Sequence, residues 1–250
     1  MATVPGTSTE ARRTVRLGVR QGVGGTIVAE LAGTEPWHPR MLAPSGAAAR
    51  IALVQSTASL LGGDDVRLVV ELGDGCALEV IELGATIAYH ARRGPGARLR
   101  VDVWLGRGAR LVWLAQPLIL AAGCRLERET RVSLAGAARV LLREAFVLGR
   151  AGEEPGRASA RTRITLEGTP VLDETFDSTA AILRSAVVAG DASVIDALTL
   201  AGMRDEDAPA EALQAHGEAT LWRGLGPARG RRDDVAGALA ARWRRACLSP

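Results

Sequence analysis

The chain has 250 residues, 47% of them hydrophobic and 24% charged, with a formal net charge of +3. This composition indicates a folded globular protein with a sizeable core, and so small a charge gives no support to nucleic-acid binding. All 31 basic residues are Arg and only 3% of residues are aromatic, so the core must consist mainly of aliphatic side chains. The basic stretch 223–245 is better explained as the solvated face of a helix than as a nucleic-acid site.

The cysteines and the absence of long apolar stretches indicate a cytoplasmic protein. Cys76, Cys124 and Cys247 are far apart and form no Cys-x-x-Cys pair, so the sequence predicts neither a disulfide framework nor a zinc site. Residues 1–13 lack the apolar core of a signal peptide, and no window approaches the roughly 18 apolar residues of a membrane helix. We therefore expect no membrane partner.

The first fifth of the chain predicts a tail, a hairpin, a loop and a short strand. Residues 1–12 are rich in small and polar types and are expected to be a disordered tail. Apolar and other residues alternate over 14–19 and 26–31 around a glycine cluster, which is the pattern of a β-hairpin. The prolines in 35–39 predict a rigid loop, and 50–54 predicts a further strand.

In the middle of the chain a turn followed by a strand recurs. Strand 66–72 leads into a glycine turn, and similar turns return at 94–97, at 106–109 and, more loosely, at 135–138. Over 99–105 every second residue is apolar, which predicts one buried face. Strands recurring every ~12 residues with glycine turns predict an all-β fold, built as stacked sheets or an irregular β-helix with few helices.

Later segments complete the fold prediction. The runs 77–83 and 139–148 are more apolar than a one-sided strand requires and are expected to be covered on both faces. A hairpin is expected over 158–176, a short helix over 178–184 and a strand over 193–200.

The clearest helix is expected over about 233–247. Acidic residues stand at its start and arginines near its end, as the helix dipole favours. Four apolar residues at i, i+4 spacing form a stripe that would pack on a sheet or a partner: Val235, Leu239, Trp243 and Cys247. We expect a single β domain over 13–250 that ends in this helix.

No catalytic signature is present in the sequence. There is no Gly-x-Ser-x-Gly motif and no His-rich metal motif, and the three histidines are isolated from one another: His38, His90 and His216. The sequence therefore predicts neither enzyme activity nor a tightly bound cofactor.

Carboxylates in apolar strands are more informative. Glu144 shares the face of its strand with Leu142 and Phe146. A carboxylate on a buried face needs an Arg partner, water or a metal ion, and an ion pair with Arg is the plainer explanation. Asp64 follows two glycines and could simply cap a turn. Together with two further carboxylates, these residues permit a polar channel lined by oxygen ligands: Glu79 and Glu82.

Four ordered motifs resemble those of a known family. They are Leu61-Gly62-Gly63-Asp64 before a strand, Leu83-Gly84-Ala85-Thr86-Ile87-Ala88-Tyr89-His90, Trp113-Leu114-Ala115-Gln116-Pro117, and Glu144 followed by Leu148-Gly149-Arg150. In this order they are similar to the urease accessory protein family UreD, also called UreH, and the segment 217–222 and the closing helix agree with it. The motif residues are Gly62, Gly63, Asp64, Thr86, Tyr89, Gln116, Pro117, Glu144, Gly149 and Arg150.

The chain also departs from the family pattern. Ile87 stands in place of the Lys of a Thr-Lys pair, and His90 or Ala91 in place of the Arg that follows. Residues 55–59 replace a glycine-rich run. These differences concern partner contacts more than the fold, so we identify a divergent member.

The resemblance implies a non-enzymatic role in urease maturation. UreD-like proteins bind apo-urease, recruit the accessory proteins UreF and UreG, and help pass nickel to the active site while UreG hydrolyses GTP. The family fold is an unusual β-helix with a polar tunnel as the proposed nickel path, which Asp64 and Glu144 would here line or gate. Oxygen ligands suit an ion in transit more than a stored one. The alternatives are a β-stack module that binds another protein or a carbohydrate, and an enzyme of β-sandwich or cupin type.

Overall fold

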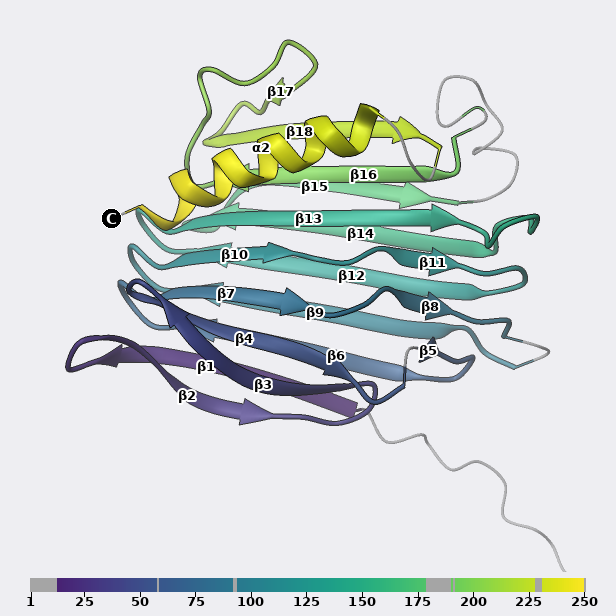
Figure 1. Ribbon diagram of the computed structural model, residues 1–250, viewed down its shortest axis with the longest axis horizontal. Helices are drawn as coiled ribbons and strands as arrows, with labels where there is room; N and C mark the ends of the chain where they lie inside the picture. The colour runs from purple at the N-terminus through teal and green to yellow at the C-terminus, as the bar shows by residue number, and fades with distance from the viewer. Residues whose placement is uncertain are drawn as a thin grey trace, which may run out of the picture.

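The computed structural model describes residues 13–57, 59–91, 94–178, 190, 192–227 and 231–249. The tail predicted over 1–12 lies outside these residues, as does all but Ser178 of the short helix predicted over 178–184. The described chain is almost entirely β-structure with one helix (Figure 1).

Two sheets face each other across the core. From edge to edge the first sheet contains β15 (Thr169–Asp177), β14 (Arg157–Leu166), β12 (Arg125–Leu134), β9 (Ala97–Leu105), β6 (Asp65–Leu72), β1 (Arg13–Gly22) and β2 (Gly25–Ala32). The second contains β17 (Leu213–Gln214), β18 (Ala219–Gly226), β16 (Val194–Ala201), β13 (Arg139–Leu148), β10 (Arg110–Leu114), β7 (Ala77–Glu82), β4 (Ala48–Gln55) and β3 (Trp37–Ser45). Three short strands extend the second sheet: β5 (Ser59–Leu60), β8 (Thr86–Ala88) and β11 (Leu118–Leu120).

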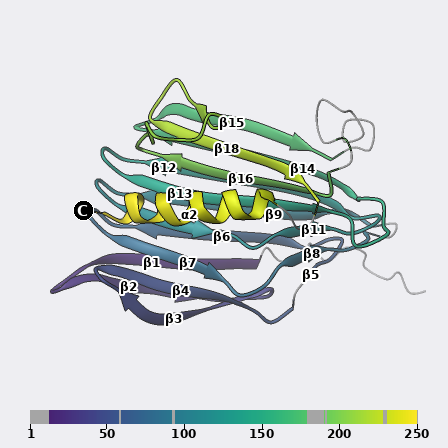
Figure 2. The ribbon, with the colours of Figure 1, turned by 45° about the horizontal axis from the view of Figure 1, so that its top comes forward.

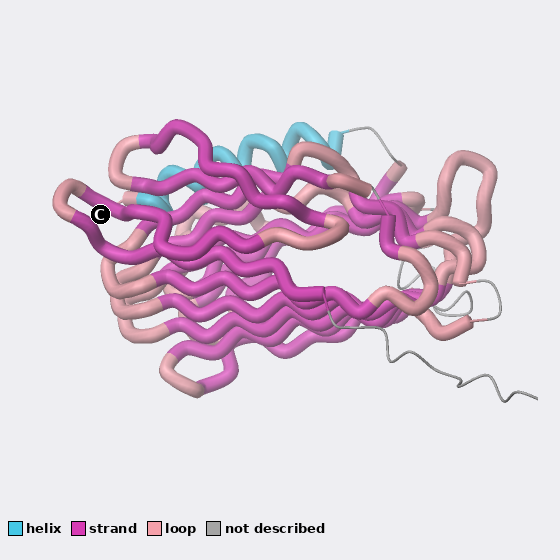
Figure 3. The backbone as a smooth tube through the Cα atoms, turned by 90° about the horizontal axis from the view of Figure 1, so that it is seen from below, coloured by secondary structure: helices cyan, strands magenta, loops and turns pink. Residues whose placement is uncertain are grey.

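The chain alternates between the sheets, so its middle forms a β-solenoid. Strands β6, β9, β12 and β14 are parallel neighbours in one sheet, and β4, β7, β10 and β13 are parallel neighbours in the other. Figure 3, seen from below, shows the strands in layers with the connecting turns stacked at the ends. The predicted all-β, stacked architecture is confirmed.

The glycine turns stack as well, which explains why they recur in the sequence. Gly75, Gly108 and Ala137 occupy equivalent places and all have left-handed backbone, with φ of 66°, 62° and 59°. The amide of Gly75 donates to the carbonyl of Arg107, and that of Gly108 to the carbonyl of Gly136, at 2.8 and 3.0 Å. Each turn thus adds a hydrogen-bonded step to the one below it.

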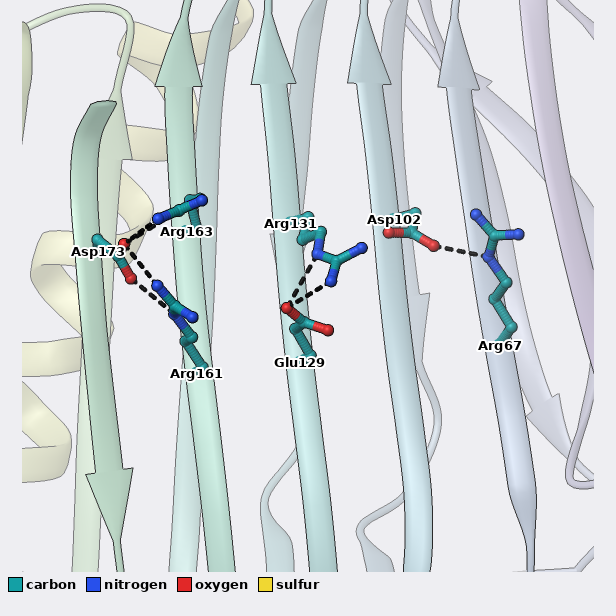
Figure 4. Close-up of polar contacts among 7 residues, drawn as sticks. All are labelled: Arg67, Asp102, Glu129, Arg131, Arg161, Arg163 and Asp173. Carbon is teal, nitrogen blue, oxygen red and sulfur yellow. Dashed lines mark hydrogen bonds and ion pairs between the residues drawn. The ribbon is translucent and has the colours of Figure 1, made fainter. Parts of the chain in front are cut away.

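Along each strand of the first sheet, successive side chains point alternately into the core and to the outer face. In β9, Leu99, Val101, Val103 and Leu105 are buried between the sheets. The outward residues form charge pairs, among them Arg67 with Asp102 at 2.6 Å and Arg161 and Arg163 with Asp173 at 2.9 and 2.6 Å (Figure 4). The two arginines hold the pKa of Asp173 below its usual range.

The helix α2 (Arg231–Leu248) covers the outer face of the second sheet (Figure 2). It includes the stretch over which the sequence predicts a helix, and its Leu239, Trp243 and Cys247 are buried against Val112 and Leu141 of the sheet. The expected cover on both faces is therefore confirmed for 139–148, where α2 packs on Leu141. For 77–83 it holds only as far as Val80, because Leu83 is 64% exposed.

An ion-pair network fixes the helix to an early strand. Both carboxylate oxygens of Glu79 on β7 accept from Arg244 of the helix, at 2.5 and 2.9 Å, and Arg50 on β4 adds a contact at 3.0 Å. The hydrogen bond from Arg244 lowers the pKa of Glu79 against the opposing effect of burial. Among the described residues, no helix is both long and apolar enough to cross a membrane.

One local prediction is wrong. Residues 37–39 were expected in a rigid loop, but β3 begins at Trp37 and pairs with β4. A proline cannot donate to a ladder, yet β3 lies at the edge of its sheet, where one side of the strand has no ladder to complete. The two prolines of the segment 37–45 are therefore compatible with a strand.

The three stacked turns give a stability prediction. Ala137 adopts a backbone that costs an L-residue about 1–2 kcal/mol, whereas glycine adopts it freely but loses about 0.5–1 kcal/mol of chain entropy. We expect Ala137→Gly to raise the free energy of unfolding by about 0.5 kcal/mol. The matched control is Gly108→Ala, whose added Cβ would meet nothing within 4 Å and should lower it by a similar amount. Urea denaturation measures both, and a loss of stability in Ala137→Gly would contradict the argument.

Candidate functional site

The second sheet is interrupted along one line. β7 ends at Glu82 and β8 begins at Thr86, while β10 ends at Leu114 and β11 begins at Leu118. The neighbouring β13 runs through without a break and pairs with both β10 and β11. Where the strands of the second sheet are interrupted, polar groups of this sheet lie across the interior from polar side chains of the first sheet.

Glu144 lies at this level, inside the solenoid. Its Oε1 lies 3.0 Å from Nη2 of Arg128, whose strand belongs to the opposite sheet. The hydroxyls of Thr130 and Thr162 donate to its two oxygens at 3.3 and 2.7 Å. The side chains of Arg128 and Glu144 are only 11% and 13% exposed. The ion pair expected as the plainer explanation of Glu144 is confirmed, and it joins the two sheets.

An aromatic pair continues this contact. The guanidinium of Arg128 lies 5.8 Å from the ring centroid of Phe146, and Phe146 stacks on Phe176 of β15 at 4.9 Å. A cation over an aromatic face is stabilised further when water is excluded. Arg128 is thus held by a carboxylate and by a ring.

A second enclosed carboxylate lies nearby. Glu82 accepts from Nε1 of Trp113 at 2.8 Å and from the backbone amide of Gln116 at 3.0 Å. Burial raises the pKa of Glu82, while these two hydrogen bonds and the charge of Arg128 act in the opposite direction. We call this set of residues the interior cluster: Glu82, Trp113, Gln116, Arg128, Thr130, Glu144 and Thr162.

Other motif residues pack together beside the interior cluster. Nε2 of Gln55 donates to the hydroxyl of Thr86 at 2.6 Å, and the amide of Thr86 donates to the carbonyl of Pro117 at 3.1 Å. The guanidinium of Arg150 lies 5.9 Å from the ring centroid of Tyr89. Residues far apart in the sequence therefore meet here, in adjacent coils for Thr86 and Pro117 and two coils apart for Tyr89 and Arg150.

Asp64 occupies a different place. Its carboxylate lies 3.2 Å from Nη1 of Arg13 and accepts from the amide of Leu61 at 2.8 Å, so it caps the turn that precedes β6. With Gly62 and Gly63 it lines an open groove of about 910 Å³ across the first ends of the parallel strands. Among the described contacts, none joins Asp64 to Glu144. That both residues line one path stays a prediction.

The donor set of the interior cluster is made of oxygens. The described residues contain no group of three or more His, Cys, Asp or Glu side chains placed to hold a metal ion. The arrangement can neutralise a cation, order water and exchange hydrogen bonds, because its carboxylates accept from donors that could be replaced.

Sequence reasoning missed the partners of Glu144, although a signal was present. In the strand over 125–134 alternate positions face the core, and Arg128 and Thr130 fall on that face with buried Leu126 and Val132. A cation and a hydroxyl on an otherwise apolar face indicate a buried polar partner. The position of Thr162 on β14 follows from its parallel register with Thr130.

Comparison with known proteins agrees with this architecture. The model of the family described as UreD urease accessory protein matches residues 11–248. A protein of Streptomyces griseus with the name urease accessory protein UreD 1 is 38% identical over 192 residues, covering 76% of this chain and 74% of its own. The urease accessory protein UreD of Streptomyces coelicolor is 40% identical over 174 residues, covering 70% and 68%.

The family and the relatives that the chain matches are accessory proteins rather than catalytic enzymes. The chain belongs to the UreD family of urease accessory proteins, and its role lies in urease maturation.

The ion pair inside the solenoid can be tested by removing one charge and then both. Glu144→Gln removes the carboxylate that lies 3.0 Å from Arg128 and leaves only the charge of Glu82 within its electrostatic reach, so we expect the free energy of unfolding to fall by about 3 kcal/mol. Adding Arg128→Met should restore most of it, because neither charge is then left unpaired. Urea denaturation followed by tryptophan fluorescence measures both. Equal losses in the single and double variants would show that the charge pair is not the source of stability.

The motif glycine Gly149 gives a matched comparison with Gly152. Both have left-handed backbone, with φ of 80° and 78°, but a Cβ on Gly149 would lie 2.4 Å from the carbonyl oxygen of Glu153 while one on Gly152 meets nothing within 4 Å. We expect Gly152→Ala to cost about 1 kcal/mol and Gly149→Ala about 3 kcal/mol, since the second adds a steric clash. Thermal unfolding compares them, and equal losses would remove the steric explanation.

Proposed function

We propose that the chain is a scaffold for nickel insertion into urease: it binds apo-urease together with the accessory proteins UreF and UreG, and helps deliver nickel to the urease active site. In this proposal the chain is a cytoplasmic chaperone of metallocentre assembly in nitrogen metabolism. Membership of the UreD family supports the maturation role. The feature of this chain that carries the proposal is the pair of enclosed carboxylates, Glu82 and Glu144.

The chemistry of these carboxylates suits a metal ion that is bound briefly and passed on. Nickel is a divalent ion that accepts oxygen ligands, and sites without imidazole or thiolate hold it less tightly. The oxygens of Glu144 are at present occupied by Arg128 and two threonines. An ion at Glu144 would take the place of the guanidinium, so binding and release would be an exchange between two cations.

Two further features support the proposal. Cys76, Cys124 and Cys247 are unpaired and buried, which fits a reducing compartment. The desolvated Glu82 lies within electrostatic reach of Arg128, which is the residue that pairs with Glu144. Asp64, on the groove, is proposed as a residue near an opening of the path.

Reconstitution of urease activation tests the proposal. Urease subunits and the remaining accessory proteins are expressed with this chain, without it, and with the double variant Arg128→Met with Glu144→Gln, and urease nickel content and urea hydrolysis are measured. We expect both readouts to collapse without the chain. The double variant should fold normally yet reduce nickel content at least fivefold, because the carboxylate is gone.

The outcomes separate the parts of the proposal. Full urease activity without the chain would remove the maturation role and favour a binding module without a metal function. Full activity with the folded double variant would leave the scaffold role and remove Glu144 from the nickel path. Asp64→Asn is the companion variant for the groove, and its turn cap survives because an amide oxygen can still accept from the amide of Leu61.

A further inference from the structure

The two ends of the solenoid are finished differently. At the end formed by the last coils, Arg223 of β18 bridges to Glu174 of β15 at 2.5 Å, and an aromatic stack closes the space between the sheets. At the end formed by β2 and β3, Leu31 and Met41 are 37% and 63% exposed. Both belong to inward-facing rows, since Leu31 pairs with buried Leu17 and Met41 with a buried isoleucine on β4. The terminal repeats of a solenoid usually present a polar outer side to solvent, whereas these two exposed positions are apolar.

Exposed apolar surface is concentrated at this end. Ten large hydrophobic side chains are exposed in the described part of the chain, and half of them lie in the β1–β2 hairpin or on β3. We call these five residues the apolar end: Val23, Ile27, Leu31, Met41 and Leu42. Such a concentration marks an interaction surface more than scattered exposure does.

The edge of β2 is protected only by a bulge and one charge, and it lacks the prolines of the β3 and β15 edges. The edge strand β3 carries two prolines and an arginine, and β15 carries Pro170 with several acidic residues. Prolines and charges are the usual means by which edges avoid pairing with other strands. β2 contains no proline and a single charge, Glu30, and in the described chain no strand pairs with its outer edge.

The charge and face pattern of β2 is complementary to itself. A bulge in the β1–β2 ladder puts both Ile27 and Glu30 on the outer face, opposite Arg20 and Gly18, while Thr26 and Leu31 face inward. Two copies of β2 can pair antiparallel about a two-fold axis that passes between Val28 and Ala29. In this register Glu30 of one copy lies opposite Ile27 of the other, and Thr26 lies opposite Leu31. Each of these pairs lies on one face, and no two charges of the same sign meet.

We propose that the chain forms a symmetric dimer in which β2 of one copy pairs with β2 of a second copy. The two first sheets become one continuous sheet of twice seven strands, and the apolar ends of both copies cover each other. The same patch serves both partners, so the contact is closed and does not propagate into a fibre. This inference is independent of the proposed function in urease maturation.

Light scattering of the purified full chain over a range of concentrations tests the dimer. The wild type should have twice the mass of one chain. Ile27→Glu places a carboxylate opposite Glu30 of the second copy, so the dissociation constant should rise at least about tenfold. Ile27→Lys places an ammonium group at the same point and should leave the dimer intact or tighter, because the facing charges are then opposite.

Controls keep the experiment decisive. Leu213 on β17 is 63% exposed and lies on an edge of the other sheet. Leu213→Glu therefore makes the same change of charge and should leave the mass measured by light scattering at twice that of one chain. Circular dichroism establishes that each variant is folded. A monomeric wild type at all concentrations overturns the proposal, as does equal weakening by Ile27→Glu and Ile27→Lys, which would mean that Glu30 does not face position 27.

Discussion

Every coil of this protein must place its turns and strands directly above those of the coil before it. The parallel strands have no offset in register from β6 to β14, so a residue type that is needed at one level is needed again at the next. The stacked turns show this most directly, because Cys76, Ala109 and Ala138 follow each other in a position with no room for solvent. The uniform aliphatic core is a consequence of the same repetition.

The interior cluster departs from this repetition. Where β7 and β10 end early, the second sheet does not continue its apolar rows, and carboxylates replace aliphatic side chains. Burying an ionised pair gives little net stability compared with apolar packing. A charge pair kept between two sheets is therefore better explained by use than by folding, and this supports its assignment to the proposed nickel path.

The sequence alone was sufficient for much of the architecture. Alternation over 99–105 and the recurring glycine turns gave the stacked β-fold, and the apolar run 139–148 gave a strand covered on both sides, because these patterns depend on neighbours along the chain. The partner of Glu144 could not be fixed in this way. Arg128 is 16 positions away and in the other sheet, so its contact depends on how the sheets face each other. The strand at Trp37 was missed for a related reason, since only the edge position of β3 makes its prolines acceptable.

The attachment of α2 to Glu79 has a consequence for biosynthesis. Arg244 lies 165 positions after its partner on β7, so the outer apolar face of the second sheet has no cover while the coils emerge from the ribosome. The solenoid can assemble strand by strand during translation, but this face is covered only when α2 has left the exit tunnel. A ribosome stalled before α2 emerges would therefore present a nearly complete solenoid with an exposed apolar face, which is the kind of nascent chain that general chaperones recognise.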